Sequence, residues 1–202
     1  SHDHFISFGL ELEKKVRFSP ALYLELAKAW MDKKQYTFAK ARLYQLNDIQ
    51  PDAQAYYLLA RIAQAEKDWD QMEINSQKAA MLDRKNSTYF HMCAQALQYQ
   101  KKYASAEEMA AKALKHSQQP NHRLFKHRAW LRWAQKKYIP AISDWKQAFA
   151  LKPDNSDLPY RIALACERKA MFQEALVYIK KAIALKPDKQ EYLKLHNRLK
   201  NR

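Results

Sequence analysis

The sequence predicts an all-α fold of stacked helical hairpins, on three observations. The chain of 202 residues holds a single glycine, whereas β-sandwiches, β-barrels and phosphate-binding loops need several for their turns. Hydrophobic residues make up 48% of it, enough for a packed core. An aromatic residue follows a short polar turn at intervals of 33, 34, 35 and 34 residues, at Tyr36, Trp69, Tyr103, Tyr138 and Phe172. Such a period is typical of helical hairpins that bury their apolar faces against neighbouring copies.

Each copy carries the signals of two helices, which we call helix A and helix B. Helix A has an aromatic residue followed by an apolar-small pair: Tyr23 with Leu26-Ala27, Tyr56 with Leu59-Ala60, and Phe90 with Cys93-Ala94. Helix B starts at the recurring aromatic, and small residues follow it, as at Ala106 and Ala113. Three copies close on a proline, which cannot continue a helix: Pro51, Pro153 and Pro187.

These residues resemble the tetratricopeptide repeat, a helix-turn-helix unit, in five tandem copies over residues 20–189. The expected copies are 20–52, 53–86, 87–121, 122–155 and 156–189. The resemblance implies an α-α superhelix, a right-handed solenoid whose A helices line a concave groove. The pentatricopeptide and half-a-tetratricopeptide repeats, both associated with RNA, have similar lengths. The helix B alanines and the closing prolines favour the tetratricopeptide type.

The two ends and the fourth copy depart from this pattern. Residues 190–202 are predicted to form a capping helix through Tyr192, Leu195 and Leu199. Residues 1–19 are expected to be a linker or the remnant helix of a truncated repeat, with Phe5, Phe8, Leu12 and Val16 on one face and a cap at Ser19-Pro20. We therefore interpret the chain as a fragment of a larger protein.

In the fourth copy, Arg128 and Arg132 stand on the packing stripe of helix A, so that helix is expected either to be rotated or to bury only the aliphatic stems. In the fifth copy, Pro159 replaces the aromatic of helix A. We expect it in the first helical turn, where its missing N–H costs nothing.

Positive charge is concentrated in the second half of the chain. The net charge is +15, but residues 1–121 hold 17 basic and 14 acidic residues, whereas residues 122–202 hold 19 and 7. A field of this sign attracts acidic protein segments, nucleic acid, anionic glycans and lipid headgroups alike. A solvated face that only keeps the protein soluble is the simpler interpretation.

The candidate binding residues are those on the side of helix A opposite the packing stripe, which faces the groove. They are Lys28, Tyr57, Arg61, His91, Gln95, Arg123, Lys126, Trp130 and Tyr160. Cations interleaved with aromatics and glutamine suit an extended peptide with acidic groups, so a protein-interaction scaffold is the predicted function. The alternative is an RNA or acidic polysaccharide bound by the basic half, with Trp130, Trp133 and Tyr160 as stacking platforms. Self-association of the solenoid is a further option.

Catalysis, metals and cofactors find no support in the sequence. The seven histidines show no HExxH spacing, and no Ser/His/Asp or Cys/His set stands out. Cys93 and Cys166 lie one per apolar stripe and are predicted to be buried structural thiols. We expect no enzyme activity and no cofactor. With no apolar run of about 20 residues, the chain is expected to be a soluble domain, cytoplasmic or periplasmic, either alone or attached to a membrane protein. The tandem array resembles those of bacterial tetratricopeptide proteins.

Overall fold

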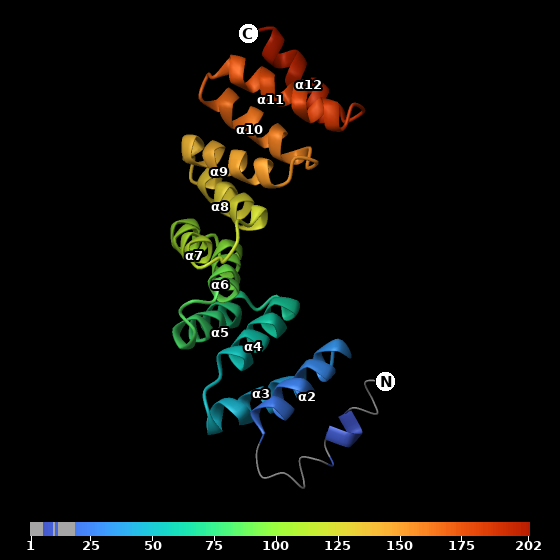
Figure 1. The fold of residues 1–202 in the computed structure, drawn as a ribbon, viewed down its shortest axis with the longest axis vertical. Coiled ribbons are helices and arrows are strands. Elements are labelled where there is room, and N and C mark those ends of the chain that lie inside the picture. Colours follow the sequence, from blue (N-terminus) through green and yellow to red (C-terminus); the bar gives the residue numbers. More distant parts are fainter. Residues whose placement is uncertain (1–5, 10, 12–18) are drawn as a thin grey trace. The chain divides into compact units, whose positions relative to one another are not determined.

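The computed structural model describes residues 6–9, 11 and 19–202, and those from 20 onward form helices joined by short turns (Figure 1). The helices are α2 (Pro20–Asp32), α3 (Tyr36–Ile49), α4 (Ala53–Glu66), α5 (Trp69–Leu82), α6 (Ser87–Tyr99), α7 (Tyr103–Lys115), α8 (His122–Ala134), α9 (Tyr138–Leu151), α10 (Asp157–Arg168), α11 (Phe172–Leu185) and α12 (Gln190–Lys200). The contacts divide the chain into unit 1, residues 1–100, and unit 2, residues 101–202.

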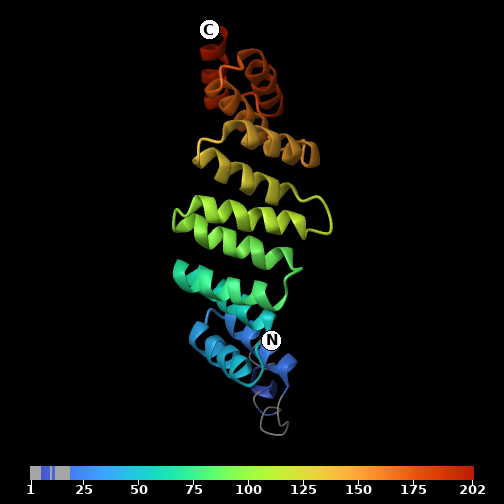
Figure 2. The ribbon, with the colours of Figure 1, turned by 90° about the vertical axis from the view of Figure 1, so that its left-hand side faces the viewer.

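Successive helices pack as hairpins within each unit. In unit 1, α2 packs on α3 and α4 on α5, and in unit 2, α8 packs on α9 and α10 on α11. Figure 2 shows α8 and α9, in yellow and orange, lying alongside each other. This alternation places the helix A to helix B turns at one end of the hairpins in each unit. The exact boundaries of the five copies stay a prediction.

The turns from helix A to helix B share an unusual backbone conformation. Each contains one residue in the left-handed region, with φ between 57° and 61°: Lys34, Lys67, Lys101, Lys136 and Ala170. A side chain in this region costs about 1 kcal/mol relative to glycine, because Cβ approaches the backbone carbonyl. The chain accepts this strain at each of these turns and uses lysine at four of them.

Side-chain caps start most A helices, as the sequence signals predicted. Ser19 Oγ accepts a hydrogen bond from Leu22 N at 3.4 Å, and Pro20 is the first helical residue of α2. Asp52 Oδ1 accepts from Ala55 N at 2.7 Å at the start of α4. Pro159 lies in the first turn of α10, as expected.

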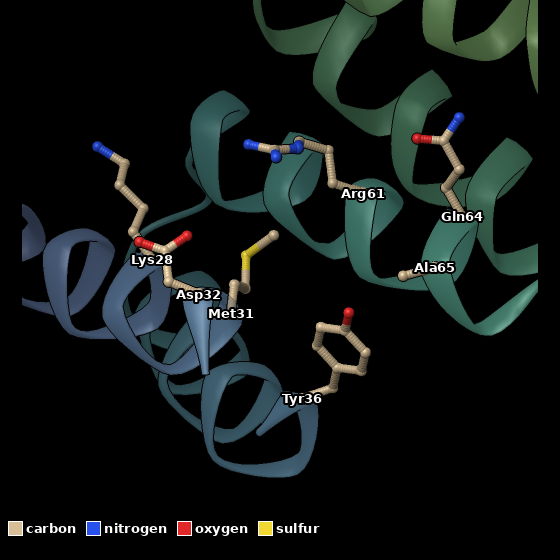
Figure 3. A pocket seen from close by; sticks show the side chains of 7 residues that line it. All are labelled: Lys28, Met31, Asp32, Tyr36, Arg61, Gln64 and Ala65. Atoms are coloured by element: carbon tan, nitrogen blue, oxygen red, sulfur yellow. The ribbon is translucent and has the colours of Figure 1, made fainter. Parts of the chain in front are cut away.

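The core of unit 1 joins α2, α3 and α4. Its cluster contains Ala27 of α2, Leu43 and Leu46 of α3, and Leu58 and Ile62 of α4, all at most 1% exposed. The A helices α2 and α4 also contact each other directly (Figure 3). Small residues at these contacts allow close helix approach, which explains the recurring alanines.

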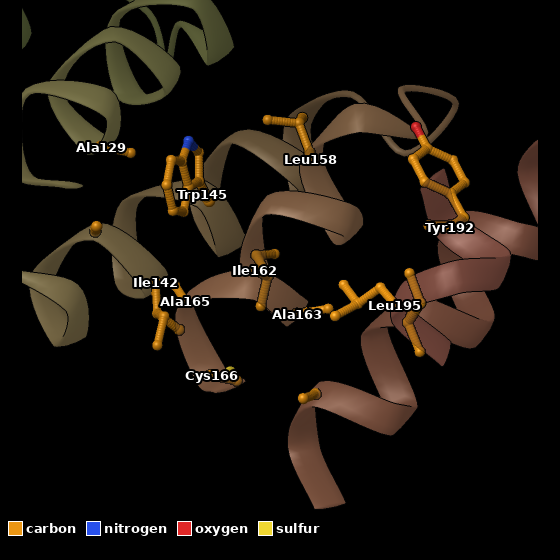
Figure 4. Packing of buried hydrophobic residues seen from close by; sticks show 14 of the residues in the cluster. Ala129, Ile142, Trp145, Leu158, Ile162, Ala163, Ala165, Cys166, Tyr192 and Leu195 are labelled. Carbon is orange, nitrogen blue, oxygen red and sulfur yellow. The ribbon is translucent and has the colours of Figure 1, made fainter. Parts of the chain in front are cut away.

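The core of unit 2 runs from α8 to α12. Figure 4 shows Trp145 of α9 between Ala129 of α8 and the α10 residues Leu158 and Ile162. Helix α12 buries the three residues that the spacing singles out, Tyr192, Leu195 and Leu199, and Tyr192 Oη donates to Ser156 Oγ at 3.2 Å. Helix α12 therefore covers the apolar side of the last hairpin.

A salt-bridge network answers the question raised by the two arginines of α8. Arg128 donates to both carboxylate oxygens of Asp144 at 2.8 and 2.7 Å, and Arg132 donates to Asp144 at 2.9 Å and to Glu107 of α7 at 2.8 Å. Lys137 completes it with a 2.8 Å bond to Glu107. The arginine side chains are about one-fifth exposed, so their stems are buried while their charges are neutralised on α7 and α9.

Two other expectations concern the N-terminus and the thiols. Phe5, Leu12 and Val16 lie outside the described residues, so their common face with Phe8 stays a prediction. Phe8 is 58% exposed, whereas Ile6 is 5% exposed. Gly9 lies so close to α2 that a Cβ there would come within 2.6 Å of Leu26 Cδ2. Cys93 and Cys166 are buried, as predicted, and are not joined in a disulfide, and burial raises the pKa of Cys166 to about 12.

Candidate functional site

A hollow of about 420 Å³ opens between the A helices of unit 1 (Figure 3). Its wall is formed by Lys28, Met31 and Asp32 of α2, Tyr36 of α3, and Arg61, Gln64 and Ala65 of α4. On each A helix the cation is followed three and four residues later by the other wall residues, which places them on one face. The hollow therefore combines the same groove position of two successive copies.

The hollow brings two cationic side chains to one surface. Lys28 Nζ lies 2.6 Å from Glu25 Oε1 in an exposed pair, which contributes little and exchanges readily with water. Arg61 is exposed, and its guanidinium extends from α4 toward Lys28 above Met31 and Tyr36 (Figure 3). Asp32 adds one carboxylate to the wall. Arginine and lysine over an apolar floor can hold a chain segment that carries a carboxylate.

Three further candidates lie on A helices of unit 1. The Tyr57 ring lies 5.3 Å from that of Tyr89 on α6, so Tyr57 takes part in helix packing as well as facing the groove. Burial, with Asp83 and Asp52 nearby, raises the pKa of Tyr89, and its hydroxyl donates to Gln54 at 3.2 Å. His91 and Gln95 are half-buried on successive turns of α6.

The remaining candidates lie in unit 2 and divide by side-chain type. Trp130 packs edge-on against Tyr103, with ring centroids 5.8 Å apart, and Tyr160 lies 4.8 Å from Tyr192 of α12. Arg123 and Lys126 are exposed on α8. The two aromatics therefore belong to helix contacts, whereas the two cations face solvent.

The start of α8 is strongly positive. Burial lowers the pKa of His122, and the charges of Arg123, Lys152 and Lys126 lower it further against the opposing effect of Asp154. The imidazole thus reports a field that favours anions at this end of the helix.

A second hollow, of about 390 Å³, lies in unit 2 and is lined by Glu167, Arg168, Arg198 and Arg202. Arg198 donates two hydrogen bonds of 2.7 Å to the carboxylate of Glu167. Sequence reasoning missed Arg198 and Arg202 because it treated residues 190–202 only as a cap. The repeat period could have found Arg198, since it stands 34 residues after Leu164, which follows the candidate Tyr160 by one helical turn.

Comparison with solved structures reveals close likeness in fold at low sequence identity. YrrB, described as a TPR protein with an unusual peptide-binding site, matches with a TM-score of 0.80 at 17% identity over 98% of both chains. A MamA structure matches with 0.77 at 16% identity, over 86% of this chain and 94% of MamA. PilF of Pseudomonas aeruginosa matches with 0.70 at 20% identity, over 90% of this chain and 83% of PilF.

The chain has the tetratricopeptide-repeat fold. The predicted fold class, an all-α solenoid of helical hairpins, is thereby confirmed. No family model and no curated protein matches the sequence. The first hollow still follows the repeat, since Lys28 and Arg61, which line it, stand at the same position of helix A in two successive copies.

The described part of this tetratricopeptide-repeat chain offers no cluster of three or more His, Cys, Asp or Glu side chains arranged for a metal ion. None of its described helices is both long enough and apolar enough to cross a membrane. The structure brings Lys28 and Arg61 together and leaves the other groove candidates as single positions. That the nine groove candidates form a binding site stays a prediction.

Proposed function

We propose that this chain is a protein-interaction scaffold that binds an extended partner segment with acidic groups along the A helices of unit 1. The observation that carries the proposal is the hollow in which Lys28 and Arg61 stand over Met31 and Tyr36. YrrB, which shares the fold, is described as having a peptide-binding site, and this supports the same class of ligand here.

The chemistry of the hollow favours a carboxylate-bearing peptide over other ligands. Arg61 presents a planar fork of donors that matches a carboxylate, and Lys28 adds a mobile point charge. Met31 and the Tyr36 ring offer apolar surface for a neighbouring side chain. Gln64 can pair with the backbone of an extended segment through its amide. Asp32 disfavours a second acidic group at its side of the hollow.

The proposal is tested with an array of short synthetic peptides, each made in acidic, neutral and basic versions. We expect the acidic versions to bind best, and Arg61→Gln to weaken the best of them about tenfold or more through loss of a charge-assisted hydrogen bond. Arg84→Gln is the matched control, because Arg84 is an exposed arginine of unit 1 outside the hollow. Equal affinities for wild type and Arg61→Gln would place the partner elsewhere.

The alternative function, binding of RNA or an acidic polysaccharide by unit 2, is favoured by one observation. Arg123, Lys126 and Lys152 lie close enough together at the start of α8 for each to lower the pKa of His122, which burial lowers most, and Arg123 and Lys126 are exposed. The proposed stacking platforms are already packed, since Trp133 also lies 5.1 Å from Tyr138 and 5.8 Å from Trp145. This function predicts a steep loss of affinity for single-stranded RNA or heparin as salt is raised. A flat salt dependence would exclude it.

A further inference from the structure

The helix A to helix B turns of unit 2 carry basic side chains of one kind. The turns before α7, α9 and α11 contain five exposed lysines and no arginine or acidic residue: Lys101, Lys102, Lys136, Lys137 and Lys169. We call this set the lysine edge. It is separate from the groove candidates, which lie along the helices rather than in the turns.

The turns of the lysine edge lie side by side. Gln135 Nε2, at the end of α8, donates to Tyr103 O at the start of α7 across 3.2 Å. Helix α10 packs on both α9 and α11, so the turn before α11 lies at the same end of these helices as the turn before α9. Figure 2 shows the turns that begin α7 and α9 at the same side of the stack. The turns that carry the lysines therefore lie at one edge of unit 2, where Lys101, Lys136 and Lys169 are exposed and Lys137 pairs with Glu107.

Three of the acidic residues near this edge are already engaged. Glu107 is held by Arg132 and Lys137, Glu174 by Lys146, and Glu167 by Arg198. Their charges therefore offset little of the field of Lys101, Lys136 and Lys169. The equivalent turns of unit 1 are different, because acidic neighbours accompany their lysines, as Asp32, Glu66 and Asp68 do.

Turn formation does not require lysine at Lys101 and Lys136, because Ala170 adopts the same left-handed conformation in the equivalent turn before α11. Lys101 and Lys136 both have φ of 61°, a conformation that glycine adopts without strain. A lysine there makes the folded chain less stable than a glycine would. Retaining it at such a position is what a functional role for the ammonium group predicts.

We propose that the lysine edge docks unit 2 onto an anionic lipid surface. Lysine is a hydrated point charge suited to diffuse attraction by many headgroups, whereas recognition of a single carboxylate or phosphate favours the arginine fork. Ile139, next to Lys137 and its turn, is 52% exposed and supplies an apolar contact for the interface. The aromatic rings at this edge, Tyr103 and Tyr138, pack on Trp130 and Trp133, so they do not offer faces to nucleic acid bases.

The test is co-sedimentation of the full chain with phosphatidylcholine vesicles, with and without phosphatidylserine. We expect binding only when phosphatidylserine is present. Lys101→Gln/Lys136→Gln/Lys169→Gln should lower the partition coefficient about a hundredfold, because each lysine near an anionic surface contributes about fivefold. The control Lys112→Gln/Lys180→Gln/Lys186→Gln removes three exposed charges of unit 2 outside these turns and should keep most of the binding.

A second variant separates loss of charge from misfolding. Lys101→Gly/Lys136→Gly should raise the midpoint of thermal unfolding, since it relieves strain, while it weakens vesicle binding. No binding to phosphatidylserine vesicles, or equal losses in the edge and control variants, would overturn the proposal. So would binding of single-stranded RNA that depends on the edge lysines when vesicle binding does not. Arg61→Gln should leave vesicle binding intact. Failure of the lipid proposal can therefore be told apart from failure of the proposed peptide binding in the hollow of unit 1.

Discussion

Asp144 is the side chain whose removal tests most directly how unit 2 holds its two buried arginines. Its side chain is 4% exposed and accepts three hydrogen bonds of 2.7 to 2.9 Å from Arg128 and Arg132. Asp144→Asn keeps the shape but removes the only carboxylate that both guanidiniums share. Breaking a buried pair costs about 3–5 kcal/mol, and because the arginine side chains are 19% and 20% exposed we expect the lower end, about 3 kcal/mol.

The free energy of unfolding in urea measures this loss. Tryptophan fluorescence follows the transition, because three of the five tryptophans, Trp130, Trp133 and Trp145, lie in unit 2, and Trp145 is buried in its core one residue after Asp144. Asp154→Asn is the control: its carboxylate is 72% exposed and lies 3.5 Å from Lys152, so the change should stay below about 0.5 kcal/mol. Equal costs for the two variants would refute the argument that the network neutralises buried charge.

Replacing the whole cluster gives a second, opposite expectation. The other copies place apolar residues at the positions of the two arginines, as Leu59 does for Arg128, and the third copy has Met109 at the position of Asp144. Arg128→Leu/Arg132→Leu/Asp144→Met should therefore be about as stable as wild type or more stable, since a well-packed apolar set replaces an ion cluster at little cost. If the triple variant were less stable than Asp144→Asn, the three charges would stabilise the fold by more than neutralising one another.

Four smaller changes follow from single contacts. Lys136→Gly should stabilise unit 2 by about 1 kcal/mol by relieving the left-handed turn, measured by urea unfolding. Asp52→Ala should destabilise α4 by about 1 kcal/mol through loss of its cap, seen as faster amide exchange at Ala55. Leu195→Ala should cost about 2–4 kcal/mol and detach α12 in thermal unfolding followed by circular dichroism. Burial alone would raise the pKa of Glu107, but hydrogen bonds from Lys137, Arg132 and Gln135 outweigh it and hold that pKa below its usual range. The stability that Glu107 contributes is thus present above pH ~4.3 and lost as the pH falls through the lowered pKa, and Glu107→Gln should remove this part of the pH profile.

The fold was predictable because a hairpin of this size buries its apolar face only against the next hairpin, so the pattern must recur in the sequence. The groove was predictable in part for the same reason, since Lys28 and Arg61 recur at one helix A position. The ion-pair partners of the charged residues could not be predicted from the sequence. Arg132 pairs with Glu107, 25 residues earlier, and side-chain length and rotamer decide such a contact across copies. Aromatic candidates such as Tyr160 were expected to be exposed to a ligand, but Tyr160 packs on the ring of Tyr192 of α12.

The glycine count shows how a correct conclusion can rest on an incomplete argument. A chain with one glycine is expected to avoid left-handed turns, and that expectation supported the exclusion of β folds. The structure instead has left-handed residues at Lys34, Lys67, Lys101, Lys136 and Ala170. Scarce glycine therefore did not exclude positive φ; it meant that each such turn carries strain. The repeat period was the decisive evidence for the fold. The strain is separate information, which points to the lysine side chains themselves as the feature that the turns retain.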